Sequence, residues 1–220
     1  MRKILLSIFM ILASVASSYA QNTIYLKQIG SSSTILLEQL GNNNAVGSAT
    51  TYSSSTGDTN NITVRQTGSS NIHNFAIIGS TNTYSSITTG DSNQFTLNCG
   101  TAIISCSNSE VNETVTGNLN TISQTIKGQG IKSTLAITGS SNQVTTNFTQ
   151  SNSTSNISIT GDTNNVNSTM NAVGGSGSTL DISILGGSNT VLTTQGGTID
   201  STVKLQVTGT SNNITVHSGN

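Results

Sequence analysis

The sequence contains neither proline nor tryptophan, and only 7% of its 220 residues are charged. A typical globular protein has about a quarter of its residues charged. The net charge of −1 leaves no basic patch of the kind that non-specific nucleic-acid binding requires. Disorder usually accompanies high net charge and few β-branched residues, whereas Ile, Val and Thr recur throughout this chain. The composition therefore indicates an ordered β-protein that does not bind nucleic acid.

Cysteine is also scarce, since Cys99 and Cys106 are the only two in the chain. In an exported protein, two cysteines this close in sequence can close a small loop as a disulfide, with two free thiols as the alternative. No histidine or acidic cluster accompanies the pair in the sequence. We therefore expect neither a metal site nor a cofactor.

Residues 1–20 have the features of a secretory signal peptide. Arg2 and Lys3 supply a positive start, and 4–16 form an apolar run too short to span a bilayer comfortably. Small residues precede the predicted cleavage point after Ala20. The sequence thus predicts export to the cell surface or beyond, and one mature domain over 21–220 without a membrane-spanning segment. An uncleaved anchor is the alternative.

One turn, Gly-x-x-Asn, recurs through the mature chain. Its successive glycine numbers differ by 27, 22, 27, 22, 22, 25 and 23, which gives a base period of 22 with four insertions. Such a period is the signature of a repeat architecture. The eight turns begin at Gly41, Gly68, Gly90, Gly117, Gly139, Gly161, Gly186 and Gly209. They end, in the same order, at Asn44, Asn71, Asn93, Asn120, Asn142, Asn164, Asn189 and Asn212.

Each turn lies between two segments in which polar and apolar residues alternate, such as 202–208 and 212–216. This alternation is typical of half-buried strands. The sequence therefore predicts an all-β fold: a β-solenoid of about eight two-strand coils, with a 22-residue repeat and two facing parallel sheets. All four insertions can be placed at the second turn of the coil, opposite the Gly-x-x-Asn edge, including two long loops over 52–59 and 100–107.

Stacked coils would place equivalent residues above one another, about 4.8 Å apart, in a rod roughly 40 Å long. The eight asparagines face inward in this arrangement, close enough for amide-to-amide hydrogen bonds along the stack. An outward column of threonines precedes the glycines and is interrupted at Leu40 and Leu185. Its members are Thr67, Thr89, Thr116, Thr138, Thr160 and Thr208.

Few residues suggest chemistry. Alternation points Glu113 and His73 inward, but no second carboxylate or metal ligand is predicted beside either. We interpret Glu113 as a local polar site and His73 as a core histidine. The other acidic residues follow turn glycines (Asp58, Asp91, Asp162) or lie at outward or edge positions (Glu38, Glu110, Asp181, Asp200). We expect no catalytic residues, and we expect that the chain is not an enzyme.

The repeat is similar to that of the curlin family, the subunits of bacterial curli fibres, whose pattern is Ser-x5-Gln-x-Gly-x-x-Asn-x-Ala-x3-Gln. Ser33, Gln39, Gly41 and Asn44 match this pattern, with Val46 and Thr50 at its last two positions, and Gln66, Gly68 and Asn71 match again. In later repeats the glutamine is replaced by Thr88, Val115, Ile137, Ile159, Ile184 and Val207. The resemblance implies a solenoid that self-assembles into amyloid-like fibres for adhesion and biofilm formation. It also implies a nucleator subunit and an outer-membrane secretion channel as partners.

The predicted strands continue to both ends of the mature chain, without the polar caps that a soluble solenoid needs. End-to-end stacking would pair these open edges. The alternative is a monomeric extracellular adhesin or a surface- or ice-binding module, although only one threonine column is regular. Apolar residues in the first coil suggest a docking surface, namely Tyr25, Ile29, Leu36 and Leu40.

Overall fold

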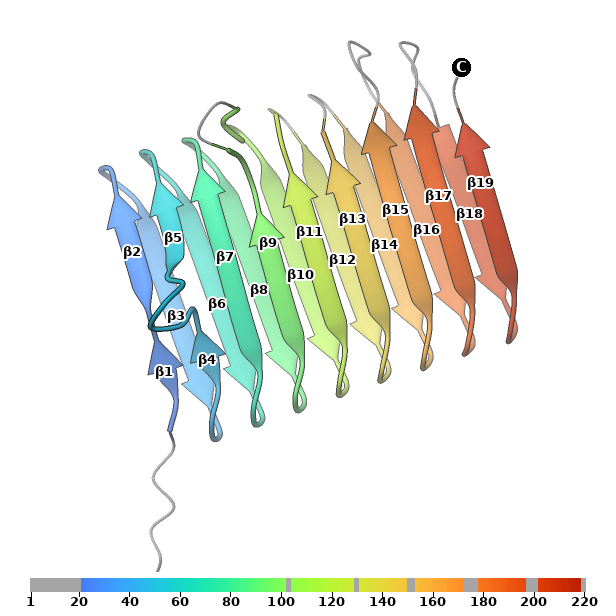
Figure 1. The fold of residues 1–220 in the computed structure, drawn as a ribbon, viewed down its shortest axis with the longest axis horizontal. Helices are drawn as coiled ribbons and strands as arrows, with labels where there is room; N and C mark the ends of the chain where they lie inside the picture. Colours follow the sequence, from blue (N-terminus) through green and yellow to red (C-terminus); the bar gives the residue numbers. More distant parts are fainter. Residues whose placement is uncertain are drawn as a thin grey trace, which may run out of the picture.

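The computed structural model describes residues 21–101, 104–128, 131–149, 153–171, 178–196 and 202–218. Within these residues, the strands form two parallel sheets that face each other along a rod (Figure 1). Each coil contributes to both sheets, and every strand pairs with the equivalent strand of the next coil. The predicted all-β solenoid of about eight coils with two parallel sheets is therefore confirmed.

One sheet, which we term sheet B, is unbroken along the rod. Each of its eight strands has seven residues, and their first residues pair with one another, as Thr83 does with Asn61 and with Glu110. The register therefore never slips from one coil to the next. The strands are β3 (Thr34–Leu40), β6 (Asn61–Thr67), β8 (Thr83–Thr89), β10 (Glu110–Thr116), β12 (Lys132–Thr138), β14 (Thr154–Thr160), β16 (Thr179–Leu185) and β18 (Thr202–Thr208).

The facing sheet, sheet A, is less regular. Its first two layers are each divided into two short strands, whereas its later layers are single strands. The divided layers are β1 (Thr23–Ile24) with β2 (Leu26–Ile29), and β4 (Ala45–Val46) with β5 (Ser53–Thr56). The others are β7 (Ile72–Ile78), β9 (Gln94–Asn98), β11 (Thr121–Ile126), β13 (Gln143–Phe148), β15 (Asn165–Asn171), β17 (Thr190–Gly196) and β19 (Asn213–Ser218).

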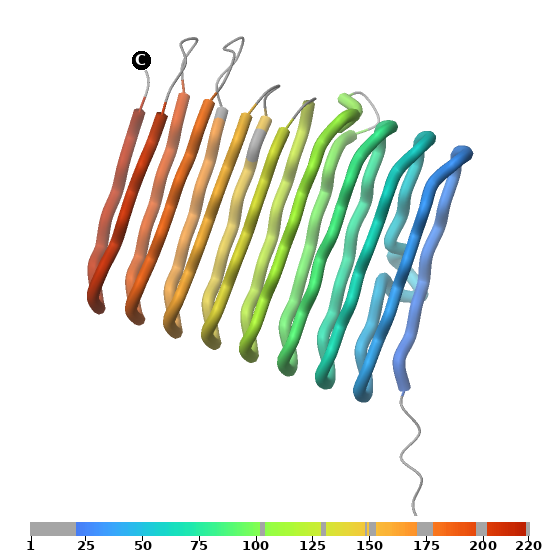
Figure 2. The backbone as a smooth tube through the Cα atoms, turned by 180° about the vertical axis from the view of Figure 1, so that it is seen from behind, coloured from blue at the N-terminus to red at the C-terminus, as the bar shows by residue number. Residues whose placement is uncertain are grey.

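The first insertion does not lie at the second edge, and the prediction of a loop over 52–59 is wrong. Ser53 and Ser55 are buried on the inward face of β5, and Gly57 takes the second turn beside Gly79. The extra residues leave sheet A between β4 and β5 instead (Figures 1 and 2). We term residues 47–52 the overhang. The strand resumes at Ser53 because its two serines occupy core positions and the following glycine fits the second turn.

The second long loop does lie at the second edge, between β9 and β10. The sequence places the two smaller insertions after β15 and after β17. They fall on residues outside the described ranges.

The core lies between the sheets and consists of the inward residues of every strand. Within the stack these side chains are almost fully buried, as are Val64, Leu135 and Ile182. Several inward residues of the two terminal coils are only partly buried, as Leu37, Leu205 and Ile214 are. A coil in a solenoid buries its apolar face against its neighbours on both sides, so a terminal coil is half covered.

Candidate functional site

The inward asparagines form a hydrogen-bonded ladder along the fixed edge. Asn93 Nδ2 donates to Asn71 Oδ1 at 3.0 Å and to the Gly117 carbonyl at 2.8 Å. Asn93 Oδ1 accepts from the backbone N–H and from Nδ2 of Asn120, both at 3.0 Å. The same pattern holds at each rung from Asn71 to Asn189. These buried amides are fully hydrogen-bonded, so they cost the core little and link every coil to the next.

The ladder continues without a break through Asn142 and Asn164, in the second half of the rod. Asn142 Nδ2 donates to Asn120 Oδ1 at 3.1 Å, and Asn164 Nδ2 donates to Asn142 Oδ1 at 3.0 Å. Asn164 Nδ2 also reaches the carbonyl of Gly186 in the next coil at 2.9 Å. The insertion of three residues that lengthens the following repeat does not disturb this edge, because Asn189 still donates to Asn164 Oδ1 at 3.0 Å.

Asn22 is a further rung that sequence reasoning missed. Its Oδ1 accepts from the Asn44 backbone N–H at 2.9 Å, and its Nδ2 donates to the Gly41 carbonyl at 2.9 Å. No glycine precedes it at the position that the repeat pattern requires, so the pattern did not include it. The signal was its position, 22 residues before Asn44.

Glycine begins each fixed-edge turn for two reasons, which Gly68 shows together. Its φ is +119°, a conformation that residues with a side chain rarely adopt. A Cβ at this position would lie closer than 3.0 Å to the carbonyl oxygen of Gly90 in the next coil, a separation that Cβ atoms essentially never show. The stack therefore brings the turns so close together that no side chain fits between them.

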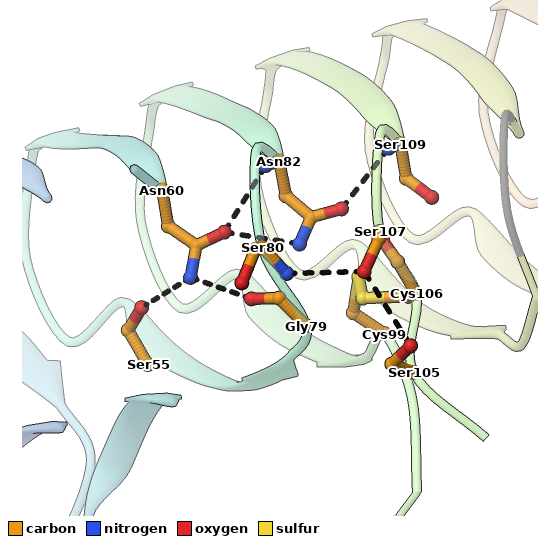
Figure 3. Close-up of a disulfide and its surroundings, with 10 residues drawn as sticks. All are labelled: Ser55, Asn60, Gly79, Ser80, Asn82, Cys99, Ser105, Cys106, Ser107 and Ser109. Carbon is orange, nitrogen blue, oxygen red and sulfur yellow. Dashed lines mark hydrogen bonds between the residues drawn. A yellow bond between two sulfur atoms is a disulfide. The ribbon is translucent and has the colours of Figure 1, made fainter. Parts of the chain in front are cut away.

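The second edge carries a shorter ladder that sequence reasoning also missed (Figure 3). Two more Gly-x-x-Asn turns lie there, over 57–60 and 79–82. Asn60 Nδ2 donates to the Gly79 carbonyl at 2.8 Å, and Asn60 Oδ1 accepts from the backbone N–H and Nδ2 of Asn82, both at 3.0 Å. Asn82 Oδ1 then accepts from the Ser109 backbone N–H at 3.0 Å. Since serine takes the place of asparagine at 109, the ladder ends there.

Cys99 and Cys106 form a disulfide where this short ladder ends (Figure 3). Both cysteines are buried and belong to the core. The neighbouring Ser107 accepts a hydrogen bond from the Ser80 backbone N–H at 3.2 Å. The disulfide thus closes the base of the loop between β9 and β10 and holds its return to the stack.

The turn aspartates connect neighbouring coils. Asp91 Oδ1 accepts from the Ser69 backbone N–H of the preceding coil at 2.6 Å, and Asp162 does the same for Ser140. Asp58 accepts from both the backbone N–H and the hydroxyl of Ser31. These hydrogen bonds favour the charged form and hold the pKa of Asp58 below its usual value. The structure therefore gives these three aspartates turn-linking contacts.

Glu113 and His73 belong to one buried polar cluster, although nothing in the sequence pairs them. Tyr84 connects them, because its hydroxyl donates to Glu113 Oε2 at 2.9 Å and is hydrogen-bonded to His73 Nε2. Gln124 Nε2 donates to Glu113 Oε1 at 2.7 Å, and Ser133 donates to the Gln124 carbonyl oxygen at 3.0 Å. The cluster therefore crosses the core from β7 to β12. Its members come from five strands, so no local pattern could reveal it.

Burial shifts the pKa values of His73, Tyr84 and Glu113 in the directions that disfavour their charged forms. It lowers the pKa of His73 to about 3. It raises the pKa of Glu113 to about 7, against the hydrogen bonds from Tyr84 and Gln124, which favour the carboxylate. Burial and the adjacent Glu113 charge raise the pKa of Tyr84 well above its usual value. His73, Tyr84 and Glu113 are at most 2% exposed, so a substrate could reach them only if the coils separated.

The remaining charged residues that the structure describes lie on the outer surface. Glu38 pairs with Arg65, and Glu110 with Lys132, at 3.4 Å in exposed positions where such pairs stabilise little. Asp181 pairs in register with Lys204, and Asp200 lies outside the described residues. Across the described part of the chain, no group of three or more His, Cys, Asp or Glu residues could hold a metal ion. The same residues include no helix long and apolar enough to cross a bilayer.

The two ends of the stack are open among the described residues. There, β18 and β19 pair with a strand on one side only, as do β3 and the β1/β2 layer at the other end. Asn212 Oδ1 accepts no hydrogen bond from a described residue, whereas the preceding rung, Asn189, accepts two from Asn212. At the opposite end, Asn22 Nδ2 donates to backbone carbonyls rather than to another asparagine.

Comparison with known proteins found no match to this chain. No protein-family profile matches the chain. No curated protein matches its sequence, and no solved structure matches its fold. The structure shows a β-solenoid, and this fold is compatible with a repetitive structural or adhesin-like protein.

Proposed function

We propose that the chain is a secreted structural subunit of the curlin type, whose copies stack end to end into extracellular amyloid-like fibres. The observation that carries this proposal is the complementarity of the two open ends. One end presents Asn212 Oδ1, an acceptor without a described donor. The other presents Asn22, whose amide occupies the next position of the same ladder. A second copy placed in register would continue the ladder across the junction.

The backbone supports the same direction of stacking. At the start of β17, the Thr190 N–H donates to the Asn212 carbonyl of the next coil. The backbone N–H groups of outward-facing residues in sheet A therefore point toward the C-terminal end of the rod. In β19 the N–H groups of Asn213, Thr215 and His217 therefore point out of the stack. Unpaired strand edges of this kind are templates for another chain. The low charge and the absence of proline leave few residues that would oppose such pairing.

The curlin-like pattern connects this geometry with a biological setting. Gln39 Nε2 donates to Gln66 Oε1 at 3.3 Å, so the two glutamines that match the pattern are adjacent rungs. On this proposal, residues 1–20 direct export and are removed after Ala20. The mature subunit then leaves through an outer-membrane channel, polymerises on a nucleator subunit and contributes to adhesion and biofilm.

The direct test is electron microscopy and fibre diffraction of purified protein over residues 21–220. We expect unbranched fibres, thioflavin fluorescence and a meridional reflection at the spacing between paired strands, about 4.7–4.9 Å. A folded monomer that never polymerises at high concentration would contradict the proposal.

A variant at the open edge makes the test specific. Thr215→Pro removes an N–H that has no partner within the described chain, and proline is tolerated at such an edge. We expect normal folding, but the critical concentration for fibre elongation should rise by at least about tenfold, the effect of losing about 1.4 kcal/mol at each junction. Thr215→Ala keeps the N–H and serves as the matched control. Equal elongation by both variants would show that this edge does not form the junction.

The alternative is a monomeric extracellular adhesin, and the overhang is the observation that favours it. Residues 47–52 leave the path of sheet A, and a disulfide closes the loop between β9 and β10 (Figure 1). Loops on a rigid scaffold often carry binding sites. Deleting both loops should leave fibre growth intact if the rod polymerises, and should abolish attachment to surfaces if the loops are adhesive.

A further inference from the structure

The overhang forms one wall of a cleft on the outer face of sheet A. The cleft has a volume of about 450 Å³, within the range of small-molecule sites, about 300–1,000 Å³. Ser48, Thr51 and Tyr52 line it from the overhang. Asn74, Thr96 and Asn98 line it from β7 and β9. The cleft exists because the insertion interrupts a strand, since an insertion at the second edge would leave this face flat.

Hydrogen bonds fix the shape of the overhang. The Gly47 N–H donates to the His73 carbonyl at 2.9 Å, which keeps the start of the overhang in the ladder. The Ser48 N–H donates to the Thr51 carbonyl at 2.7 Å, and the Thr51 N–H donates to Ser48 Oγ at 2.9 Å. The chain re-enters the ladder where the Ser53 N–H donates to the Tyr25 carbonyl at 2.9 Å. The wall is thus built before any ligand arrives, which lowers the entropic cost of binding.

The lining is neutral and combines an aromatic ring with amides and hydroxyls. Tyr52 contacts Tyr25 edge to face, with ring centroids 6.1 Å apart, and remains 53% exposed. Asn74 and Asn98 provide amide donors and acceptors, and Ile72 adds an apolar contact. The residues that line the cleft include no Asp, Glu, Lys, Arg or His.

This chemistry selects among ligand classes. A phosphate or other anion would lose its hydration without gaining a cationic partner, and a metal ion would find no carboxylate. An added peptide strand needs free backbone donors, but the Phe75 N–H, which faces the interruption, donates to Ser53 Oγ at 3.2 Å. A sugar ring fits better, because its C–H face packs on an aromatic ring while its hydroxyls bond to amides and hydroxyls.

We propose that this cleft is a binding site for a neutral carbohydrate, a short stretch of hexose or N-acetylhexosamine units. Tyr52 carries the sugar face, and Asn74 and Asn98 bind its hydroxyls. The site lies wholly within one chain. It therefore does not depend on fibre formation, and either proposal can fail while the other stands.

The test is calorimetric titration of monomeric 21–220 protein with cello-oligosaccharides, chito-oligosaccharides and, as the charged comparison, oligogalacturonate. Tyr52→Ala should weaken binding of the neutral oligosaccharide by at least about tenfold, as expected for an aromatic anchor. Tyr52→Phe should bind nearly as the unmodified protein does, because the ring remains. Circular dichroism and the unfolding temperature of each variant check that the fold is intact.

A matched pair of asparagines locates the site. Asn98 lies in the cleft, and Asn147 faces outward at the equivalent position two strands further along sheet A. Asn98→Ala should weaken binding, whereas Asn147→Ala should leave it unchanged. Equal weakening by both variants would place the ligand on the open sheet face and overturn the proposal. Absence of binding by every neutral oligosaccharide, or tighter binding of oligogalacturonate, would also overturn it.

Discussion

The buried cluster of His73 and Glu113 predicts a stability profile that depends on two opposing titrations. The pKa of His73 falls from 6.5 to about 3 on folding, so the folded state excludes the charged imidazole. The associated stability is complete above pH 6.5 and is lost as the pH falls toward 3. The pKa of Glu113 rises from 4.5 to about 7, so its contribution is complete below pH 4.5 and is lost as the pH rises through 7.

The effects of the His73 and Glu113 titrations on the free energy of unfolding nearly cancel between about pH 4.5 and 7.5. Across this window the His73 term lowers the free energy of unfolding toward acid and the Glu113 term lowers it toward base, each by about 3 kcal/mol, at about 1.4 kcal/mol for each pKa unit. We expect the cluster to contribute a nearly flat profile in the unmodified protein. The other titrating groups are common to all variants, so differences between variants isolate these two terms.

Two single substitutions should tilt the profile in opposite directions. Glu113→Gln leaves the histidine term, so stability relative to the unmodified protein should fall by about 3 kcal/mol, the size of the missing carboxyl term, as the pH drops from about 7.5 to 4.5. His73→Phe leaves the carboxyl term, so relative stability should fall by a similar amount as the pH rises across the same window. Phenylalanine fits this position, because His73 already stacks on Phe95 with ring centroids 4.9 Å apart.

The measurement is urea unfolding of the monomeric protein at several pH values, followed by circular dichroism. Profiles of the two variants that run parallel to that of the unmodified protein would refute the reasoning. They would show that both groups keep ordinary pKa values in the folded state.

Three further tests by substitution address the ladders and the disulfide. Gly117→Ala should destabilise the protein by at least about 3 kcal/mol in chemical unfolding, because its Cβ would collide with the Gly139 carbonyl oxygen; a normal stability would show that the turns can separate freely. Asn120→Ala should lower the free energy of unfolding by about 3 to 5 kcal/mol, because it leaves buried hydrogen-bond partners in two coils unsatisfied. The outward Asn156→Ala should change stability little. Equal effects of the two substitutions would show that the ladder does not contribute to stability. Replacing Cys99 and Cys106 together by alanine should lower stability by about 2.5 kcal/mol, the loop-closure value for so short a loop, and reductant should have the same effect on the unmodified protein but none on the variant.

The regular parts of the fold could be predicted because each repeats a signal. The spacing of Gly41 and its equivalents fixes the coil length, and alternation assigns each residue to one face. The position of the overhang could not be predicted in this way, because Ser53 and Ser55 are core residues without apolar side chains. The Gly-x-x-Asn turns that begin at Gly57 and Gly79 were visible in the sequence but did not fit a repeat with one conserved edge.

The parts of the candidate site that repeat in every coil could be predicted from the sequence, whereas the parts that occur once could not. The asparagine ladder follows from stacking alone, whereas Asn22 needed its spacing to be considered without the glycine. The cluster around Tyr84 depends on which side chains meet across the core, and pairing of strands in one sheet says nothing about contacts with the other. The cleft beside Tyr52 required the path of the overhang, which no residue pattern specifies.

The eight equal strands of sheet B have a consequence for what the rod can carry. Sheet A is interrupted twice near the N-terminal end, yet the register of sheet B passes these coils unchanged. The constant register of sheet B therefore sets the length of the rod, whereas sheet A can accept insertions. A foreign peptide inserted at the overhang should be displayed at a fixed place on the rod without altering its length. In a polymer of such subunits, the inserted peptide would recur at the repeat distance of one subunit.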